Sequence, residues 1–232
     1  MPAPKPAPSP KPARSPSAGE VLNRCPVIPV LTVERTADAA PLARALVAGG
    51  LSVLEVTLRT PVAERAITAM RAAVPDALVG AGTVLTPADL DRAQRAGAQF
   101  VVSPGLTPAL EAAARTAPVA LIPGVATAGE IMKAADAGFA HLKFFPAAAA
   151  GGVAALKALA GPLPGVRLCP TGGIGPDSLA DYLSVATVAC VGGSWMVPKA
   201  ALDAGDFQRI TALAADAVAR AEAAPGPGRR LT

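Results

Sequence analysis

The stretch Ala128-Gly-Glu-Ile-Met-Lys-Ala-Ala-Asp-Ala-Gly138-Phe-Ala-His-Leu-Lys-Phe-Phe-Pro146 contains the pattern that decides the fold. Its first half is rich in alanine and predicts a helix that ends at Gly138. Its second half is a short apolar run that predicts a strand buried on both faces. Such helix and strand units build parallel sheets that are covered by helices.

The same alternation recurs along most of the chain. The predicted strands are Pro26–Thr32, Leu51–Thr57, Leu78–Gly82, Gln99–Ser103, Val119–Pro123, His141–Phe145, Val166–Pro170 and Val188–Gly192. The predicted helices are Ala37–Ala48, Val62–Val74, Pro87–Ala96, Pro108–Arg115, Ala128–Ala137, Val153–Leu159, Pro176–Leu183 and Phe207–Ala221. Prolines at the first helical position mark several of the helix starts, and glycines mark several of the ends.

Eight strand and helix units favour a single (β/α)₈ barrel, a TIM barrel, over residues 19–222. A doubly wound open sheet is the structural alternative. That fold would place a Gly-x-Gly-x-x-Gly turn after its first strand, whereas Val33-Glu-Arg-Thr36 follows the first strand here. The chain has 232 residues, which suits one large α/β domain.

The two ends of the chain differ in composition from this domain. Residues 1–18 are rich in proline, so we expect a disordered N-terminal tail, and residues 223–232 read as a flexible C-terminal tail. These two ends carry five basic side chains and no acidic one. Subtracting five from the net charge of +4 leaves −1 for the domain between them. The basic charge therefore lies in the tails, and we expect no nucleic-acid binding.

Other compositional features narrow the location of the protein. The three cysteines have neither a Cys-x-x-Cys spacing nor a histidine-rich neighbourhood, so neither a disulfide framework nor a zinc site is predicted. No apolar run is long enough to span a membrane, and no secretory signal is present. A transit peptide is disfavoured because the prolines prevent an amphipathic helix. We expect a cytoplasmic protein without membrane contact.

Lys143 is the first candidate for chemistry. A buried amine is disfavoured in its charged form, and a neutral amine is a nucleophile that forms a Schiff base with a ketone. In Leu51-Ser-Val-Leu-Glu-Val-Thr-Leu-Arg59, strand alternation points Glu55 to the inside, where a carboxylate needs a cationic partner. Lys143 is the candidate partner, and a purely structural Glu–Lys ion pair is the alternative.

Further polar residues follow the predicted strands, at the end where barrel enzymes assemble their sites. Arg59 can hold a carboxylate through two parallel hydrogen bonds, although a surface arginine is the alternative. Thr83 offers a hydroxyl. His141 is the only histidine and lies toward the start of its strand, so we interpret it as structural. One histidine and no acidic cluster give no metal ligand set.

Two glycine pairs follow the last two predicted strands. Gly172 and Gly173 come after Thr171, and Gly193 precedes Ser194. Glycine lets backbone amides approach an anion, and barrel enzymes frequently bind phosphate at these two loops. The two pairs therefore predict a phosphate site.

Seven motifs together resemble the 2-keto-3-deoxy-6-phosphogluconate (KDPG) aldolases, a family that includes 4-hydroxy-2-oxoglutarate aldolases. The resemblance covers roughly residues 20 to 222. The motifs are Leu54-Glu-Val-Thr-Leu-Arg-Thr60, Val79-Gly-Ala-Gly-Thr-Val84, Val102-Ser-Pro-Gly105, Leu121-Ile-Pro-Gly124, Lys143-Phe-Phe-Pro-Ala147, Pro170-Thr-Gly-Gly-Ile174 and Gly192-Gly-Ser-Trp195.

The resemblance implies a class I aldolase on a (β/α)₈ barrel that forms a homotrimer, serves the Entner–Doudoroff route and needs no cofactor or metal. Its expected substrate is a phosphorylated keto acid, which is cleaved to pyruvate and glyceraldehyde 3-phosphate. The alternatives are a 4-hydroxy-2-oxoglutarate aldolase and a phosphate-binding barrel without catalysis.

The resemblance also implies roles for individual residues. Lys143 matches the Schiff-base lysine and Glu55 the general acid and base. Arg59 and Thr83 match groups near the pyruvyl carboxylate, and Phe145 and Thr171 match residues of the substrate channel. The matching phosphate cradle is made of Gly172, Gly173, Gly193 and Ser194. Ala148 departs from the family, because relatives often carry an acid there, and we expect an effect on packing or assembly.

Overall fold

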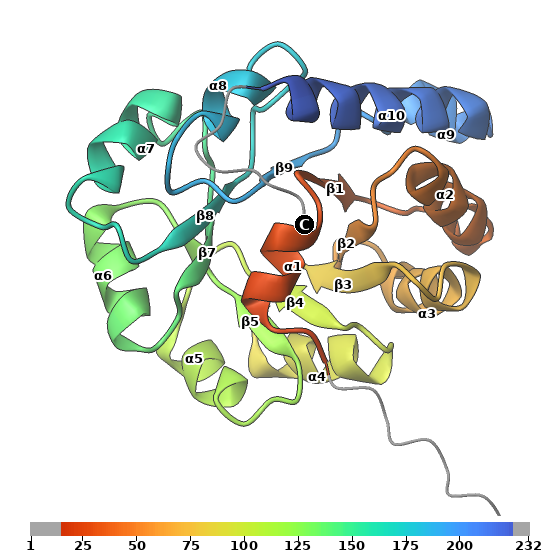
Figure 1. Cartoon of the computed structure of the whole chain (residues 1–232). Coiled ribbons are helices and arrows are strands. Elements are labelled where there is room, and N and C mark those ends of the chain that lie inside the picture. Colours follow the sequence, from red (N-terminus) through yellow and green to blue (C-terminus); the bar gives the residue numbers. More distant parts are fainter. Residues whose placement is uncertain (1–14, 225–232) are drawn as a thin grey trace, which may run out of the picture.

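The structure is a computed structural model that describes residues 15–224, so most of both predicted tails lies outside the described residues. Helices surround a curled parallel sheet (Figure 1). The elements in chain order are α1 (Ala18–Arg24), β1 (Val27–Leu31), α2 (Thr36–Ala48), β2 (Val53–Thr57), α3 (Ala63–Ala73), β3 (Leu78–Gly82), α4 (Pro87–Arg95), β4 (Phe100–Val102), α5 (Pro108–Ala114), β5 (Ala120–Ile122), β6 (Gly124–Val125), α6 (Ala128–Asp136), β7 (His141–Phe144), α7 (Gly152–Ala160), β8 (Arg167–Pro170), α8 (Leu179–Leu183), β9 (Val191–Gly193), α9 (Lys199–Asp203) and α10 (Phe207–Ala223).

The strands form two parallel ladders. One has six strands in the order β5-β4-β3-β2-β1-β9, and the other has three in the order β6-β7-β8. The ladders meet at Pro123, between β5 and β6, where the chain changes its pairing partner from β4 to β7. Single parallel bridges connect the second ladder to the region of β9: Leu168 pairs with Val188 before β9, and Thr171 pairs with Gly192 within β9. The predicted parallel α/β architecture is confirmed.

Most predicted elements are present with boundaries shifted by one to three residues. The predicted strand Val119–Pro123 is present as β5, and a further short strand, β6, which was not predicted, begins directly after Pro123, a residue that has no N–H for a ladder hydrogen bond. The last predicted strand began too early: the ladder of β9 starts at Val191, and Val188 makes only an isolated bridge. The helix α9 was not predicted.

The helix α1 was not predicted either. Ser17 caps it, since its hydroxyl accepts a hydrogen bond from the N–H of Glu20, and the Glu20 carboxylate accepts one from the N–H of Ser17. Ser17 and Ala18 therefore begin a helix and do not belong to the tail, in which the prediction had placed them. Val21 and Leu22 are buried, so α1 is part of the core.

The helix α1 lies across the N-terminal ends of the strands. A Cβ added at Gly19 would lie 3.0 Å from the ring of His141 at the start of β7, so α1 passes close to this ring. A groove beside them is bordered by Val119 and Ala120 at the start of β5. The opposite, C-terminal ends of the strands lead into the loops that carry most of the predicted site residues. Within residues 15–224, no helix is both long and apolar enough to cross a bilayer.

Candidate functional site

Lys143 and Glu55 form a buried ion pair inside the curled sheet. Lys143 comes from β7 and Glu55 from β2, and the Lys143 Nζ lies 3.1 Å from the Glu55 Oε1. The two side chains are only 9% and 5% exposed. Because each charge would be costly to bury alone, the pair stabilises both side chains in this position. The predicted partnership between these two residues is confirmed as a contact.

Phe145 forms one wall around the amine. The Lys143 Nζ lies 5.3 Å from the centre of the Phe145 ring, a distance that allows a cation–π contact while the amine is charged. On the neighbouring strand β8, Cys169 pairs in register with Lys143, so both side chains leave the sheet on the same face. Sequence reasoning missed Cys169, although its position two residues before Thr171 gives it the same strand parity.

Arg59 and Thr83 meet just beyond the ends of β2 and β3. The Arg59 Nε donates a hydrogen bond of 3.2 Å to the Thr83 hydroxyl. Arg59 is exposed, so its guanidinium is accessible to a ligand as well. Thr83 has a φ of 60°, which a β-branched side chain rarely adopts, and strained residues of this kind cluster at ligand sites. The two predicted residues thus form one group at the C-terminal end of the sheet.

The two predicted phosphate loops are neighbours in space. Thr171 is buried and forms a parallel bridge with Gly192, which brings the Gly172–Gly173 turn beside Gly193. The Thr171 hydroxyl donates to the carbonyl of Cys169 at 3.3 Å. Gly172 and Gly173 have φ angles of 102° and 74°, in a region that favours glycine.

The loop after β7 is hydrogen-bonded to this turn. The N–H groups of Ala147 and Ala148 donate to the carbonyls of Thr171 and Gly172, at 2.8 and 3.0 Å. Ala148, the position at which the family resemblance led us to expect an acid, therefore lies against the glycine turn. Because a Cβ added at Gly173 would lie only 2.6 Å from the Ala148 Cβ, position 173 has no room for a side chain.

Comparison with known proteins identifies the family. Residues 19–213 match the family described as KDPG and KHG aldolase. The chain belongs to this family. The resemblance drawn from the seven motifs is thereby confirmed.

Relatives of the family are similar over nearly their whole length. The chain is 54% identical over 202 residues to the KHG/KDPG aldolase of Escherichia coli (strain K12), which covers 87% of this chain and 95% of that protein. Among solved structures, the KDPG aldolase of Legionella pneumophila, with pyruvate captured as a covalent carbinolamine, is 48% identical with a TM-score of 0.86. That match covers 88% of this chain and 98% of the other.

A second solved relative carries a different ligand. The KDPG aldolase of Zymomonas mobilis ZM4 with 3-phosphoglycerate is 53% identical, has a TM-score of 0.82, and covers 87% of this chain and 95% of its own. These two aldolases were therefore captured with a keto acid and with a phosphorylated carboxylate.

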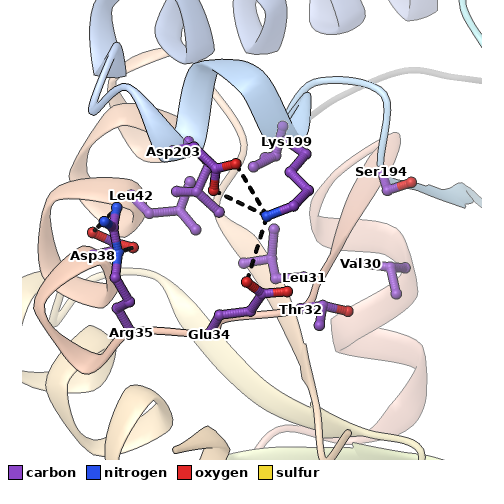
Figure 2. A pocket seen from close by; sticks show the side chains of 12 residues that line it. Val30, Leu31, Thr32, Glu34, Arg35, Asp38, Leu42, Ser194, Lys199 and Asp203 are labelled. Atoms are coloured by element: carbon purple, nitrogen blue, oxygen red, sulfur yellow. Dashed lines mark hydrogen bonds and ion pairs between the residues drawn. The ribbon is translucent and has the colours of Figure 1, made fainter. Parts of the chain in front are cut away.

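A pocket of about 390 Å³ lies beside Ser194, between the end of β1 and the loop from β9 to α9 (Figure 2). At its rim the Lys199 Nζ lies 3.0 Å from Asp203 and 3.5 Å from Glu34. The hydrogen bond to Asp203 raises the pKa of the Lys199 amine. Arg35 pairs with Asp38 in the same pocket at 2.8 Å. The sequence did not predict this pocket, because Glu34 and Lys199, which meet at its rim, are 165 positions apart in the chain.

The remaining expectations concern His141 and metals. His141 is half-buried beside α1, and its pKa is lowered by burial and by the nearby Arg167. It lies at the N-terminal end of β7, which agrees with the structural interpretation. In the part of the chain that the structure describes, no three His, Cys, Asp or Glu side chains are grouped so that they could hold a metal ion.

Proposed function

We propose that this chain is a Schiff-base aldolase that cleaves KDPG reversibly to pyruvate and glyceraldehyde 3-phosphate. The observation that carries the proposal is the buried contact between Lys143 and Glu55, 3.1 Å apart. It provides a nucleophilic amine and a proton carrier within reach of one carbonyl. The family membership and the carbinolamine captured in the Legionella relative support the same chemistry.

The proposed reaction needs only these two side chains. Neutral Lys143 attacks C2 of the keto acid, and Glu55 assists the loss of water that gives an iminium. The iminium draws electrons, so removal of the C4 hydroxyl proton by Glu55, through a water, breaks the C3–C4 bond. Glyceraldehyde 3-phosphate leaves, Glu55 protonates the enamine at C3, and hydrolysis releases pyruvate. One carboxylate can perform these transfers because they are sequential, and neither a metal nor an organic cofactor takes part.

The surrounding groups receive binding roles in this proposal. Arg59 and Thr83 bind the pyruvyl carboxylate, since a guanidinium matches a carboxylate in two parallel hydrogen bonds. Thr171 and Phe145 line the path between the carboxylate and the phosphate. The phosphate binds at the two adjacent loops, through Gly172, Gly173, Gly193 and Ser194.

The finer architecture is part of the proposal. The bridges between β8 and the segment around β9 support a closed (β/α)₈ barrel in which β5 and β6 count as one strand. We also propose a cytoplasmic homotrimer. Two exposed apolar side chains, Leu85 and Met132, are candidates for its interface. Light scattering tests the assembly, because a trimer has three times the chain mass of 22.9 kDa.

Borohydride reduction in the presence of pyruvate tests the function. An imine former gains the mass of a reduced pyruvyl group on a peptide that contains Lys143. No adduct is expected from a phosphate-binding barrel with a purely structural ion pair, so its absence would refute the aldolase assignment. The ratio of kcat/KM for KDPG to kcat/KM for 4-hydroxy-2-oxoglutarate then decides between the two aldolase activities.

A further inference from the structure

The strand β3 has glycines, which have no side chain, at two positions beside the strand that carries Glu55. Its residues Gly80 and Gly82 pair in register with Glu55 and Thr57 of β2, so all four positions face the interior together. Neither glycine has a φ in the left-handed region, and alanine could therefore adopt the same backbone at both positions. The absence of a side chain at these positions is thus a matter of space.

The space at Gly82 is occupied by the Glu55 side chain. A Cβ built at Gly82 would overlap the Glu55 Oε1 and would lie 2.8 Å from both its Cδ and its Cγ. Real Cβ atoms essentially never come this close to another heavy atom. Since the Cγ is also affected, a turn of the carboxylate alone would not relieve the overlap. Glu55 is 4% exposed, so its side chain has no solvent-filled space to swing into.

We propose that Gly82 is a positioning residue for proton transfer: its missing side chain lets the Glu55 carboxylate lie against β3, at the distance from Lys143 that catalysis requires. The inference rests on the proposed function and on Glu55 as the proton carrier. Gly82 itself contacts no reacting atom in this scheme and acts through Glu55. A displacement of a catalytic group by about 1 Å can cost about 10²-fold in rate.

Gly80 provides a matched control on the same strand. The three heavy atoms nearest to a Cβ at Gly80 would all be ring carbons of Phe100, at 2.6 Å, and none belongs to Glu55. Alanine at position 80 therefore disturbs the buried packing without pushing the carboxylate. Gly105, where an added Cβ meets nothing within 4 Å, serves as the control for a harmless substitution.

Two measurements separate the steps of the reaction in Gly82→Ala. Borohydride trapping with pyruvate reports imine formation at Lys143, and exchange of the pyruvate methyl protons with D₂O reports proton transfer at C3. We expect Gly82→Ala to lose about 10²-fold in exchange rate and in kcat, with little change in KM and with trapping retained. Gly80→Ala and Gly105→Ala should exchange at the wild-type rate per folded molecule. Wild-type exchange in Gly82→Ala would overturn the inference.

A double variant covers the case in which Gly82→Ala does not fold. Aspartate at position 55 is one methylene shorter, so no atom of it reaches the position of the Glu55 Oε1, where the overlap with the new Cβ is most severe. Adding Gly82→Ala to Glu55→Asp should then cost less in exchange rate than adding it to the natural chain, and should raise the yield of folded protein relative to Gly82→Ala alone. An equal loss in both backgrounds would refute the positioning role.

Failure of this inference differs from failure of the proposed function. If the natural enzyme forms no borohydride adduct, the aldolase assignment is wrong whatever position 82 does. If the adduct forms and Glu55→Gln slows exchange while Gly82→Ala does not, the function stands and the role of Gly82 is refuted.

Discussion

The two ends of the strands differ in what their side chains do. At the C-terminal end and in the interior below it lie a buried ion pair, a strained threonine and glycines with positive φ. At the N-terminal end lies α1, a capped helix that buries Val21 and Leu22. The C-terminal end carries groups whose burial or backbone strain costs free energy and which the proposed chemistry needs. The N-terminal end is covered by apolar contacts. Substitutions at the C-terminal end should therefore change activity, and those at the N-terminal end should change stability.

The largest effect is expected at Lys143. Lys143→Ala should abolish turnover and borohydride trapping, because no other amine is paired with Glu55 among the residues described. Near-normal aldol cleavage by this variant would contradict the Schiff-base assignment. Lys157, an exposed lysine on α7, is the control, and Lys157→Ala should leave both measurements unchanged. Circular dichroism of each variant checks that the fold is kept.

The next largest effect is expected at Glu55. Glu55→Gln keeps the shape of the side chain and removes its ability to carry a proton, so kcat should fall by about 10²- to 10⁴-fold. Imine formation should continue, and the borohydride adduct should therefore still appear. Full activity of Glu55→Gln in steady-state assays would show that the ion pair is structural.

Much of the active end could be predicted from the sequence, because strand parity and burial are local properties. Glu55 had to face inward if Val56 faced the helices, and a buried carboxylate required a cation such as Lys143. The helix starts at Pro87 and Pro108 were predicted for similar reasons, and the structure shows that the preceding threonines, Thr86 and Thr107, cap these helices. These features depend on a few consecutive residues.

The rest depends on residues that are far apart in the chain. Gly82 has its role because Glu55, 27 positions earlier, fills the space above it, and no local pattern reveals this. The change of partner at Pro123 likewise depends on β4 and β7, which pair with β5 and β6 and lie in other parts of the chain. The helix α1 is different, since Ser17 and Glu20 have the spacing of a capping box in the sequence itself. It was missed because the prolines before it led us to extend the tail too far.

A substitution of Leu22 at the N-terminal end should lower stability and leave activity unchanged, the opposite of what we expect at the C-terminal end. Leu22 on α1 is 1% exposed, so Leu22→Ala should lower the free energy of unfolding by about 2–5 kcal/mol. The kcat per folded molecule should not change, because α1 lies at the other end of the strands. Urea unfolding and steady-state kinetics test this together. Asn23→Ala, at the exposed neighbouring position, should alter neither quantity.

A smaller effect at the active end is expected from Ser194. Ser194→Ala removes one hydrogen-bond donor from the proposed phosphate site, and a hydrogen bond to a charged group contributes about 1.5–3 kcal/mol. The KM for KDPG should therefore rise by roughly tenfold or more, and the KM for unphosphorylated 4-hydroxy-2-oxoglutarate should stay near its natural value. Equal changes for both substrates would remove the phosphate role of Ser194.

The smallest effect we expect is a dependence of the free energy of unfolding on pH that comes from His141 at the N-terminal end of the strands. Burial and Arg167 lower the pKa of His141 in the folded protein. The unfolded chain then binds the proton more readily, so the free energy of unfolding should decrease as the pH falls below about 6.5, the ordinary histidine value, and level off below the folded pKa. In His141→Gln this part of the pH dependence should vanish, as urea unfolding between pH 5 and pH 8 would reveal. Since α1 contacts His141, the lost stability should appear first as faster hydrogen exchange in α1. If the natural protein and the variant lose stability in parallel over this range, His141 does not couple α1 to pH.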